Sequence, residues 1–253
     1  MPAPNPRLAA LRAEIAALEG RARSGREVIA FGDERLDSHL PGGGLALGHW
    51  HEFVGEGLEL ETAAASAAFV ARLAAPLAKC GEMVWVLRRD DLHAPGLAGL
   101  GFPADRLIQV CARDDAEALA VMEDALRTAG VAAVFGEVGE VDLTAGRRLQ
   151  LACEQAAATG FVLRRRPFGG TAKTAVSSAA TRWRLAPSPS EPAPGEFGLG
   201  APRWRVSLER CRGGRTGSWV LQAREEDDAA HPFRLVADLG DRDLAPPPLR
   251  LAG

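Results

Sequence analysis

The amino-acid sequence predicts an α/β protein with a mostly parallel sheet that is flanked by helices and extended by antiparallel strands. Short apolar runs alternate with stretches of helix length in the first two thirds of the chain, which is the order of a parallel sheet with crossover helices. In the last third, apolar and polar side chains alternate, as they do in antiparallel strands with one buried face. The 253 residues are enough for one large domain of this class.

The first predicted helix spans residues 7–23, where apolar side chains recur at i, i+3, i+7 and i+10. One proline and three glycines at 41–44 form a turn. We expect a strand at 49–54 after this turn, and then an alanine-rich helix at 62–78 that Glu61 or Thr62 stabilises by charge–dipole interaction or capping.

Continuous apolar runs such as Met83–Leu87 are typical of strands buried on both faces. Asp114 and Asp115 stand where a helix N-terminus favours negative charge. On these grounds the further elements are strands at 83–87, 107–110, 131–135 and 161–163, helices at 116–129 and 144–159, and alternating strands at 181–186, 203–210, 218–223 and 233–237.

These elements divide the chain into three parts. Residues 1–27 are the N-terminal helix and a linker, and residues 28–240 are the core. Within the core, residues 187–202 are rich in proline and glycine, so we expect a flexible loop there. Residues 241–253 contain three consecutive prolines and form a tail.

Composition excludes several classes of protein. The sequence has no apolar run of the ~18–20 residues that a membrane helix needs, and its N-terminus lacks the pattern of a secretory signal. Its four cysteines are scattered without a C-x-x-C pair, which argues for free thiols and against a zinc ribbon. We therefore expect a cytoplasmic protein without a membrane partner.

Residues 55–62 have the spacing of a phosphate-binding loop, G-x-x-x-x-G-K-[ST], with its key residues replaced. Leu60 takes the place of the second glycine and Glu61 that of the lysine, so a carboxylate stands where an ammonium would attract phosphate. The sequence thus predicts a degenerate nucleotide site, which comprises Gly55, Glu56, Gly57, Glu61 and Thr62.

The order of these segments resembles the core of the RecA recombinases and, more closely, the ImuA family of RecA-like proteins from bacterial inducible-mutagenesis cassettes. The resemblance runs over residues 7–224. It is carried by LRAEIAALEG, PGGGLALGHWHEF, WVLRRDDLHAPGL, FGEVGEVDLTAGRRLQLA, TRWRL and PRWRVSLERCRGGRTGSW.

Two further elements of a RecA-type ATPase differ in this sequence. The strand at 131–135 runs into Gly136 where such enzymes carry a magnesium-orienting aspartate, and the nearest carboxylates are Glu137 and Glu140. The place of the water-activating glutamate reads Leu87–Asp91. We therefore expect no catalytic residue, no ATP or magnesium, and no enzymatic activity.

The resemblance implies a non-catalytic scaffold in DNA-damage-induced (SOS) translesion synthesis and mutagenesis. The implied partners are an ImuB-type inactive Y-family polymerase, an error-prone DnaE-type polymerase, RecA and single-stranded DNA, with a nucleoid-associated location. Two alternatives stay open. One is a nucleotide-binding switch or weak ATPase in which Glu137 or Asp90 replaces the magnesium ligand, and the other is a SulA-like inhibitor of cell division.

Residues 161–224 hold twelve basic and three acidic residues, a net of +9 in a chain whose formal charge is −3. Arginines interleaved with Trp183 and Trp204 favour phosphate contact with base stacking, and residues 167–180 match the DNA-contacting loop of RecA. A solvated arginine face or an acidic protein partner would explain the pattern as well. The candidate contacts are Arg164, Arg165, Arg166, Lys173, Arg182, Arg184, Arg203, Arg205, Arg210, Arg212 and Arg215.

The histidines do not form an evident metal or catalytic site. His49 and His51 lie two residues apart on the strand at 49–54, but no third ligand is evident, so we expect them to pack or to hydrogen-bond. His93 follows two aspartates without a nucleophile nearby, which favours a helix cap.

Overall fold

The structure, a computed structural model, describes residues 27–165, 177–190, 192, 195, 197–224 and 231–239. The predicted N-terminal helix at 7–23, the tail at 241–253 and most of the loop at 167–180 lie outside the described residues. The division of the chain into three parts therefore stays a prediction.

The described residues form a sheet in the order β11-β10-β9-β8-β3-β7-β6-β4-β5, in which the six strands from β8 to β5 run parallel and β9, β10 and β11 continue antiparallel. This confirms the predicted fold class. Its strands are β3 (Trp50–Gly55), β4 (Glu82–Leu87), β5 (Leu107–Cys111), β6 (Val131–Val138), β7 (Thr159–Arg164), β8 (Thr181–Ser188), β9 (Arg203–Cys211), β10 (Gly217–Ala223) and β11 (Phe233–Asp238). Short strands β1 (Val28–Ile29) and β2 (Leu45–Ala46) pair separately.

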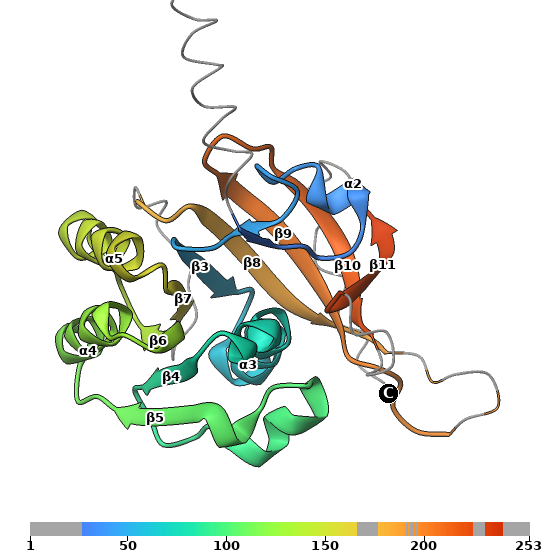
Figure 1. Cartoon of the computed structure of the whole chain (residues 1–253). Helices are drawn as coiled ribbons and strands as arrows, with labels where there is room; N and C mark the ends of the chain where they lie inside the picture. Colours follow the sequence, from blue (N-terminus) through green and yellow to red (C-terminus); the bar gives the residue numbers. More distant parts are fainter. Residues whose placement is uncertain are drawn as a thin grey trace, which may run out of the picture.

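Helices cover both faces of the parallel part of the sheet (Figure 1). On one face lie α4 (Asp115–Arg127) and α5 (Leu143–Ala156), and on the other lies α3 (Glu59–Ala74). The remaining helical segments are α2 (Glu34–Asp37) and the 3-10 helices η1 (Ala75–Lys79), η2 (Ala94–Leu100) and η3 (Ala104–Arg106). Among the described residues, no helix is long and apolar enough to cross a membrane.

Several boundaries differ from the predicted ones. Helix α3 starts at Glu59 rather than at 62, with two glutamates in its first turn, where negative charge favours helix formation. Strand β6 continues through Gly136 to Val138, and Met122 occupies the space that a Cβ on this glycine would need. Helix α5 ends at Ala156, followed by Ala157 in the left-handed conformation, whereas the prediction extended it to 159. Strand β8 reaches Ser188, two residues into the predicted loop.

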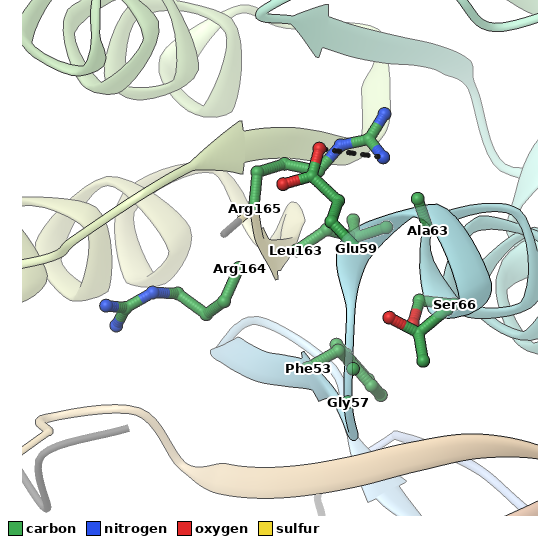
Figure 2. Close-up of a pocket in the computed structure, with 10 residues that line it drawn as sticks. Phe53, Gly57, Glu59, Ala63, Ser66, Leu163, Arg164 and Arg165 are labelled. Atoms are coloured by element: carbon green, nitrogen blue, oxygen red, sulfur yellow. Dashed lines mark ion pairs between the residues drawn. The ribbon is translucent and has the colours of Figure 1, made fainter. Parts of the chain in front are cut away.

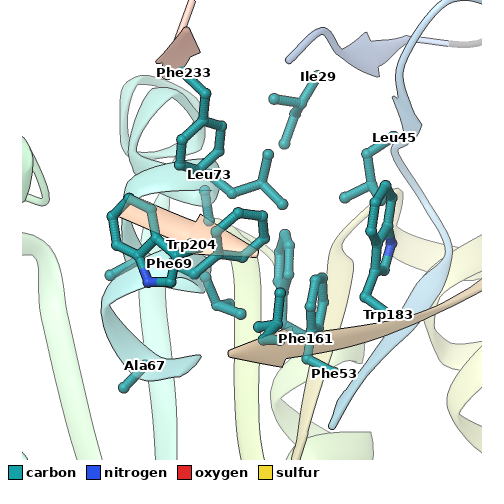
Figure 3. Packing of buried hydrophobic residues seen from close by; sticks show 14 of the residues in the cluster. Ile29, Leu45, Phe53, Ala67, Phe69, Leu73, Phe161, Trp183, Trp204 and Phe233 are labelled. Carbon is teal, nitrogen blue, oxygen red and sulfur yellow. The ribbon is translucent and has the colours of Figure 1, made fainter. Parts of the chain in front are cut away.

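A row of aromatic rings crosses the core on the α3 face, and Figure 3 shows its part from Phe161 and Phe53 to Phe69, Trp204 and Phe233. Trp85 stacks on Phe135 with ring centroids 4.6 Å apart, and Phe135 stacks on Phe161 at 5.0 Å. Phe53 and then Phe69 of α3 extend the row, at 6.1 and 6.3 Å. From Phe69 the row continues to Phe233 and Trp204, at 4.8 and 5.7 Å, so the parallel and antiparallel parts share one core.

Arg72 of α3 joins three segments that are distant in the sequence. Its buried guanidinium donates hydrogen bonds to the carbonyl oxygens of Leu100, Arg224 and Pro232, over 2.9, 2.6 and 3.2 Å. Side-chain donors on backbone acceptors satisfy carbonyl groups that would otherwise be buried without a partner. The end of η2 is therefore tied through α3 to the ends of β10 and β11.

His51 is fully buried in β3, which confirms that it hydrogen-bonds. Its Nε2–H donates to the carbonyl oxygen of Ala46 and its Nδ1 accepts from the Thr181 hydroxyl, both over 2.8 Å. The same hydroxyl oxygen accepts from Trp183 Nε1. Both ring nitrogens are thus used by the neutral imidazole, and burial lowers the pKa of His51 to about 3.

We predict that His51 makes stability depend on pH. Below the ordinary histidine pKa of about 6.5, the unfolded chain binds a proton at His51 that the folded chain refuses until about pH 3. The free energy of unfolding should therefore fall as the pH decreases through this window, by up to ~1.4 kcal/mol per pH unit from this group. Urea denaturation of His51→Gln should give a shallower pH slope, whereas exposed His93→Gln should keep the original slope. An unchanged slope in His51→Gln would contradict the assignment.

Candidate functional site

The degenerate loop joins β3 to α3 through three residues, Glu56, Gly57 and Leu58. A Cβ on Gly55 would lie 2.3 Å from Thr62 Oγ1, so glycine is needed here for the close approach of strand and helix. The Thr62 hydroxyl donates to the Leu58 carbonyl oxygen over 3.1 Å, within the helix. Capping by Thr62 is therefore wrong, since Leu58 is the N-cap residue and makes no side-chain cap.

Two carboxylates of the loop region lie where a phosphate-binding loop would present donors. Glu61 stands exposed in the first turn of α3, and its Oε2 would be 3.3 Å from a Cβ on Gly57, whose φ is +99°. Glu56 pairs with Arg205 of β9 over 2.9 Å. The structure thus brings the five predicted residues together, but as an arrangement with negative charge at the helix N-terminus.

Beside this loop, Arg165 stands among three carboxylates. Its guanidinium lies 3.0 Å from Glu137, 3.1 Å from Asp91 and 3.8 Å from Glu59. Arg89 adds a second guanidinium, 3.7 Å from Glu59. Figure 2 shows Arg165 and Glu59 turned toward each other beside the start of α3. We call Glu59, Arg89, Asp91, Glu137 and Arg165 the Arg165 cluster.

Glu137 lies within β6 and has 1% of its surface exposed. One of its oxygens accepts from Trp85 Nε1 over 3.3 Å, and the other faces Arg165. Burial raises the pKa of Glu137, and the positive charge of Arg165 opposes that rise. Among the described residues, no group of three His, Cys, Asp or Glu side chains is arranged to hold a metal ion.

On the opposite face of the sheet, Glu52 of β3 forms a second internal ion-pair site. Glu52 Oε1 lies 2.6 Å from Arg164 Nη1, and its Oε2 lies 3.8 Å from Arg182 Nε. All three side chains are nearly buried. The solvated arginine face considered above is therefore wrong for Arg182, because Trp183 and Arg182 are both buried on opposite faces of β8.

Most other predicted contact arginines are partly exposed and paired within the chain. Arg184 Nη2 lies 2.5 Å from Glu209, and Arg203 donates to the Gln222 amide oxygen over 2.8 Å. Arg205 pairs with Glu56, as described. Arg166 and Lys173 lie outside the described residues. A role of these side chains in DNA or partner contact stays a prediction.

Arg210, Arg212 and Arg215 are exposed at the turn between β9 and β10. Arg210 and Arg212 donate to the carbonyl oxygens of Ser177 and Ser178, the latter over 3.1 Å. The turn is fixed to His39, which follows α2: the backbone N–H of Arg215 donates to the His39 carbonyl oxygen over 2.9 Å, and His39 Nδ1 donates to the Thr216 carbonyl oxygen over 2.8 Å. In this arginine turn, hydrogen bonds hold the guanidinium groups of Arg210 and Arg212 and the backbone of Arg215.

Sequence reasoning missed the carboxylates that pair with the arginines: Glu52, Glu59, Asp91 and Glu209. Only Glu52 left a signal, because a charged residue inside the apolar segment 50–54 is rarely buried without a partner. The partner itself, Arg164, is 112 residues away in the sequence.

Fold and site together define a RecA-like α/β protein in which carboxylates occupy the phosphate-loop region. The chain matches no protein-family model. Protein ImuA of Caulobacter vibrioides, in two strains of that species, is 57% identical over 235 residues, which cover 90% of this chain and 96% of the relative. The chain therefore belongs to the ImuA family.

The first prediction from this site concerns Glu52. Glu52→Gln should lower the free energy of unfolding by about 3 kcal/mol, because two buried guanidinium groups lose their shared counter-charge. Chemical denaturation measures this loss. Glu82→Gln, which breaks an exposed pair with Arg106, should change stability by less than about 0.5 kcal/mol. Equal effects of the two substitutions would show that the Glu52 pairs are not buried.

A second prediction concerns Gly55. Gly55→Ala should destabilise the fold by about 1–3 kcal/mol, since the added methyl group meets Thr62. Gly55→Ala combined with Thr62→Ala should recover part of this loss, because the contact at 2.3 Å disappears. Gly99→Ala, with open space around its position, is the control. Full stability of Gly55→Ala would mean that strand and helix do not approach so closely.

Proposed function

We propose that this chain is a nucleotide-independent, non-catalytic accessory protein in DNA-damage-induced mutagenesis. Membership of the ImuA family supports the biological role. The proposed independence of nucleotide rests on the Arg165 cluster. In this cluster, the basic side chain beside the phosphate-loop region is already paired with Glu137, Asp91 and Glu59.

Electrostatics argue against a bound nucleotide at this place. A phosphate at the start of α3 would meet Glu59 and Glu61 in the first helical turn. Two like charges at ~4 Å and an effective dielectric constant of ~20 repel by roughly 4 kcal/mol. Neither ATP nor magnesium is therefore part of the proposed mechanism.

On this proposal the protein acts by holding partners together. An ImuB-type inactive Y-family polymerase is the principal partner, with an error-prone DnaE-type polymerase, RecA and single-stranded DNA as further ones, in the cytoplasm near the nucleoid. The arginine turn supports an anionic contact, because its arginines are exposed and its backbone is fixed to His39. Guanidinium groups bind both carboxylates and phosphates in bidentate geometry.

The test compares two double variants in capture of the ImuB-type protein from the same bacterium. Arg212→Gln with Arg215→Gln should weaken capture at least about tenfold, a change of ~1.4 kcal/mol, because two charged contacts are lost. Arg106→Gln with Arg113→Gln, which flank β5 at the opposite edge of the sheet, should leave capture unchanged. Addition of ATP and magnesium should change neither result.

A parallel titration with labelled single-stranded DNA distinguishes the kinds of anion. A steep salt dependence that the Arg212 and Arg215 variant reduces would mean direct phosphate contact. Partner capture without DNA binding would make the turn a protein contact. Capture that requires ATP, or ATP turnover by the purified chain, would refute the nucleotide-independent mechanism.

A further inference from the structure

A cleft of about 590 Å³ separates α3 from η2, and its volume is in the range of ligand-binding pockets, ~300–1,000 Å³. The wall on α3 consists of alanine side chains, Ala63, Ala64, Ala67 and Ala68. The opposite wall includes Leu92, Leu97 and Leu100. These two walls of the cleft are therefore apolar, and the cleft is wide because the side chains on α3 are small.

One end of the cleft is the Arg165 cluster, which lines it with three carboxylates and two guanidinium groups. One of these carboxylates is short of hydrogen-bond donors. Glu59 Oε2 is buried without a hydrogen-bond partner among the described residues, whereas Glu137 Oε2 lies 3.0 Å from Arg165 Nε. The guanidinium groups of Arg89 and Arg165 come no closer than 3.7 and 3.8 Å to the other oxygen of Glu59.

These distances matter because a charged hydrogen bond forms at about 2.7–2.9 Å. Arg165 is shared among three carboxylates, and it makes its hydrogen bond to Asp91 rather than to Glu59. A buried carboxylate oxygen without a donor is costly, and a ligand that supplies N–H groups would remove that cost. The cluster contains three carboxylates and two guanidinium groups, so a ligand that matches its charge is a cation.

We propose that the α3–η2 cleft binds an arginine side chain from an apolar segment of a partner protein, with the guanidinium group at Glu59 and Asp91. The planar guanidinium group presents several donors and serves two carboxylates at once. Flanking aliphatic residues of the partner would lie between the alanine wall of α3 and the leucines opposite. This inference rests on the proposed accessory role, because it places a partner contact beside the degenerate phosphate-binding loop.

Trp85 provides a direct reporter, because its indole N–H donates to Glu137 at the end of the cleft. The probes are acetyl-Leu-Arg-Leu-amide and the same tripeptide with citrulline, which has the shape of arginine without its charge. Titration of the full ¹⁵N-labelled chain should shift the Trp85 indole signal with the arginine tripeptide, with a dissociation constant in the millimolar range of short ligands. The citrulline tripeptide should bind at least about tenfold more weakly.

Two variants locate the contact. Glu59→Gln should weaken binding of the arginine tripeptide at least about tenfold, because the carboxylate is lost. Glu61→Gln, which removes a carboxylate from the same helical turn but outside the cleft lining, should leave binding unchanged. The indole signals of the other four tryptophans report whether each variant keeps its fold.

Each remaining outcome decides against the proposal. Equal binding of the citrulline tripeptide, or equal loss in Glu59→Gln and Glu61→Gln, would exclude recognition of the charge at Glu59. Equally tight binding of arginine amide would mean that the apolar walls contribute nothing. Absence of any shift would refute the cleft as a site and leave the arginine turn and the accessory role intact, whereas a shift with ATP and magnesium would contradict both proposals.

Discussion

Two consecutive arginines, Arg164 at the end of β7 and Arg165 directly after it, link the central strands of this sheet. Side chains alternate along a strand, so Arg164 and Arg165 point to opposite faces, as Figure 2 shows. Arg164 pairs with Glu52 on one face, and Arg165 pairs with Glu137 on the other. Each pair is nearly buried. Removing one partner of such a pair strongly destabilises a fold, because the other charge is left buried without compensation. The neighbouring strands β3, β7 and β6 are thereby fixed to each other by charge as well as by hydrogen bonds.

The same arrangement explains which predictions from sequence were reliable. Periodicity identified the strands and the order of the elements because apolar runs such as Met83–Leu87 reflect burial directly. The base stacking considered for Trp183 and Trp204 is wrong, because alternation along β8 and β9 places both rings on the buried face of the sheet. The predicted start of α3 was too late because the phosphate-loop pattern extends to Thr62, whereas Glu59 and Glu61 already stand in the first turn of the helix.

The partners of the arginines could not be derived from sequence. A run of three arginines at 164–166 is typical of an exposed basic surface, and nothing local shows that Arg164 will be buried. Its burial depends on Glu52, which only the pairing of β3 with β7 brings near. Asp91 and Glu59 come together with Arg165 from three separate segments, so the Arg165 cluster exists only in the folded chain. Predicting an electrostatic site of this kind requires the register of the strands as well as the pattern of the sequence.

The buried tryptophans also determine the ultraviolet fluorescence of the protein. The chain has five tryptophans and no tyrosine, and each tryptophan is at most 2% exposed. Its near-ultraviolet emission therefore arises from indole groups in an apolar environment. Trp183 and Trp219 lie 6.4 Å apart, and Trp85 stacks on Phe135. Because these rings are fixed relative to one another and belong to both parts of the sheet, a single emission spectrum reports the packing of the whole core.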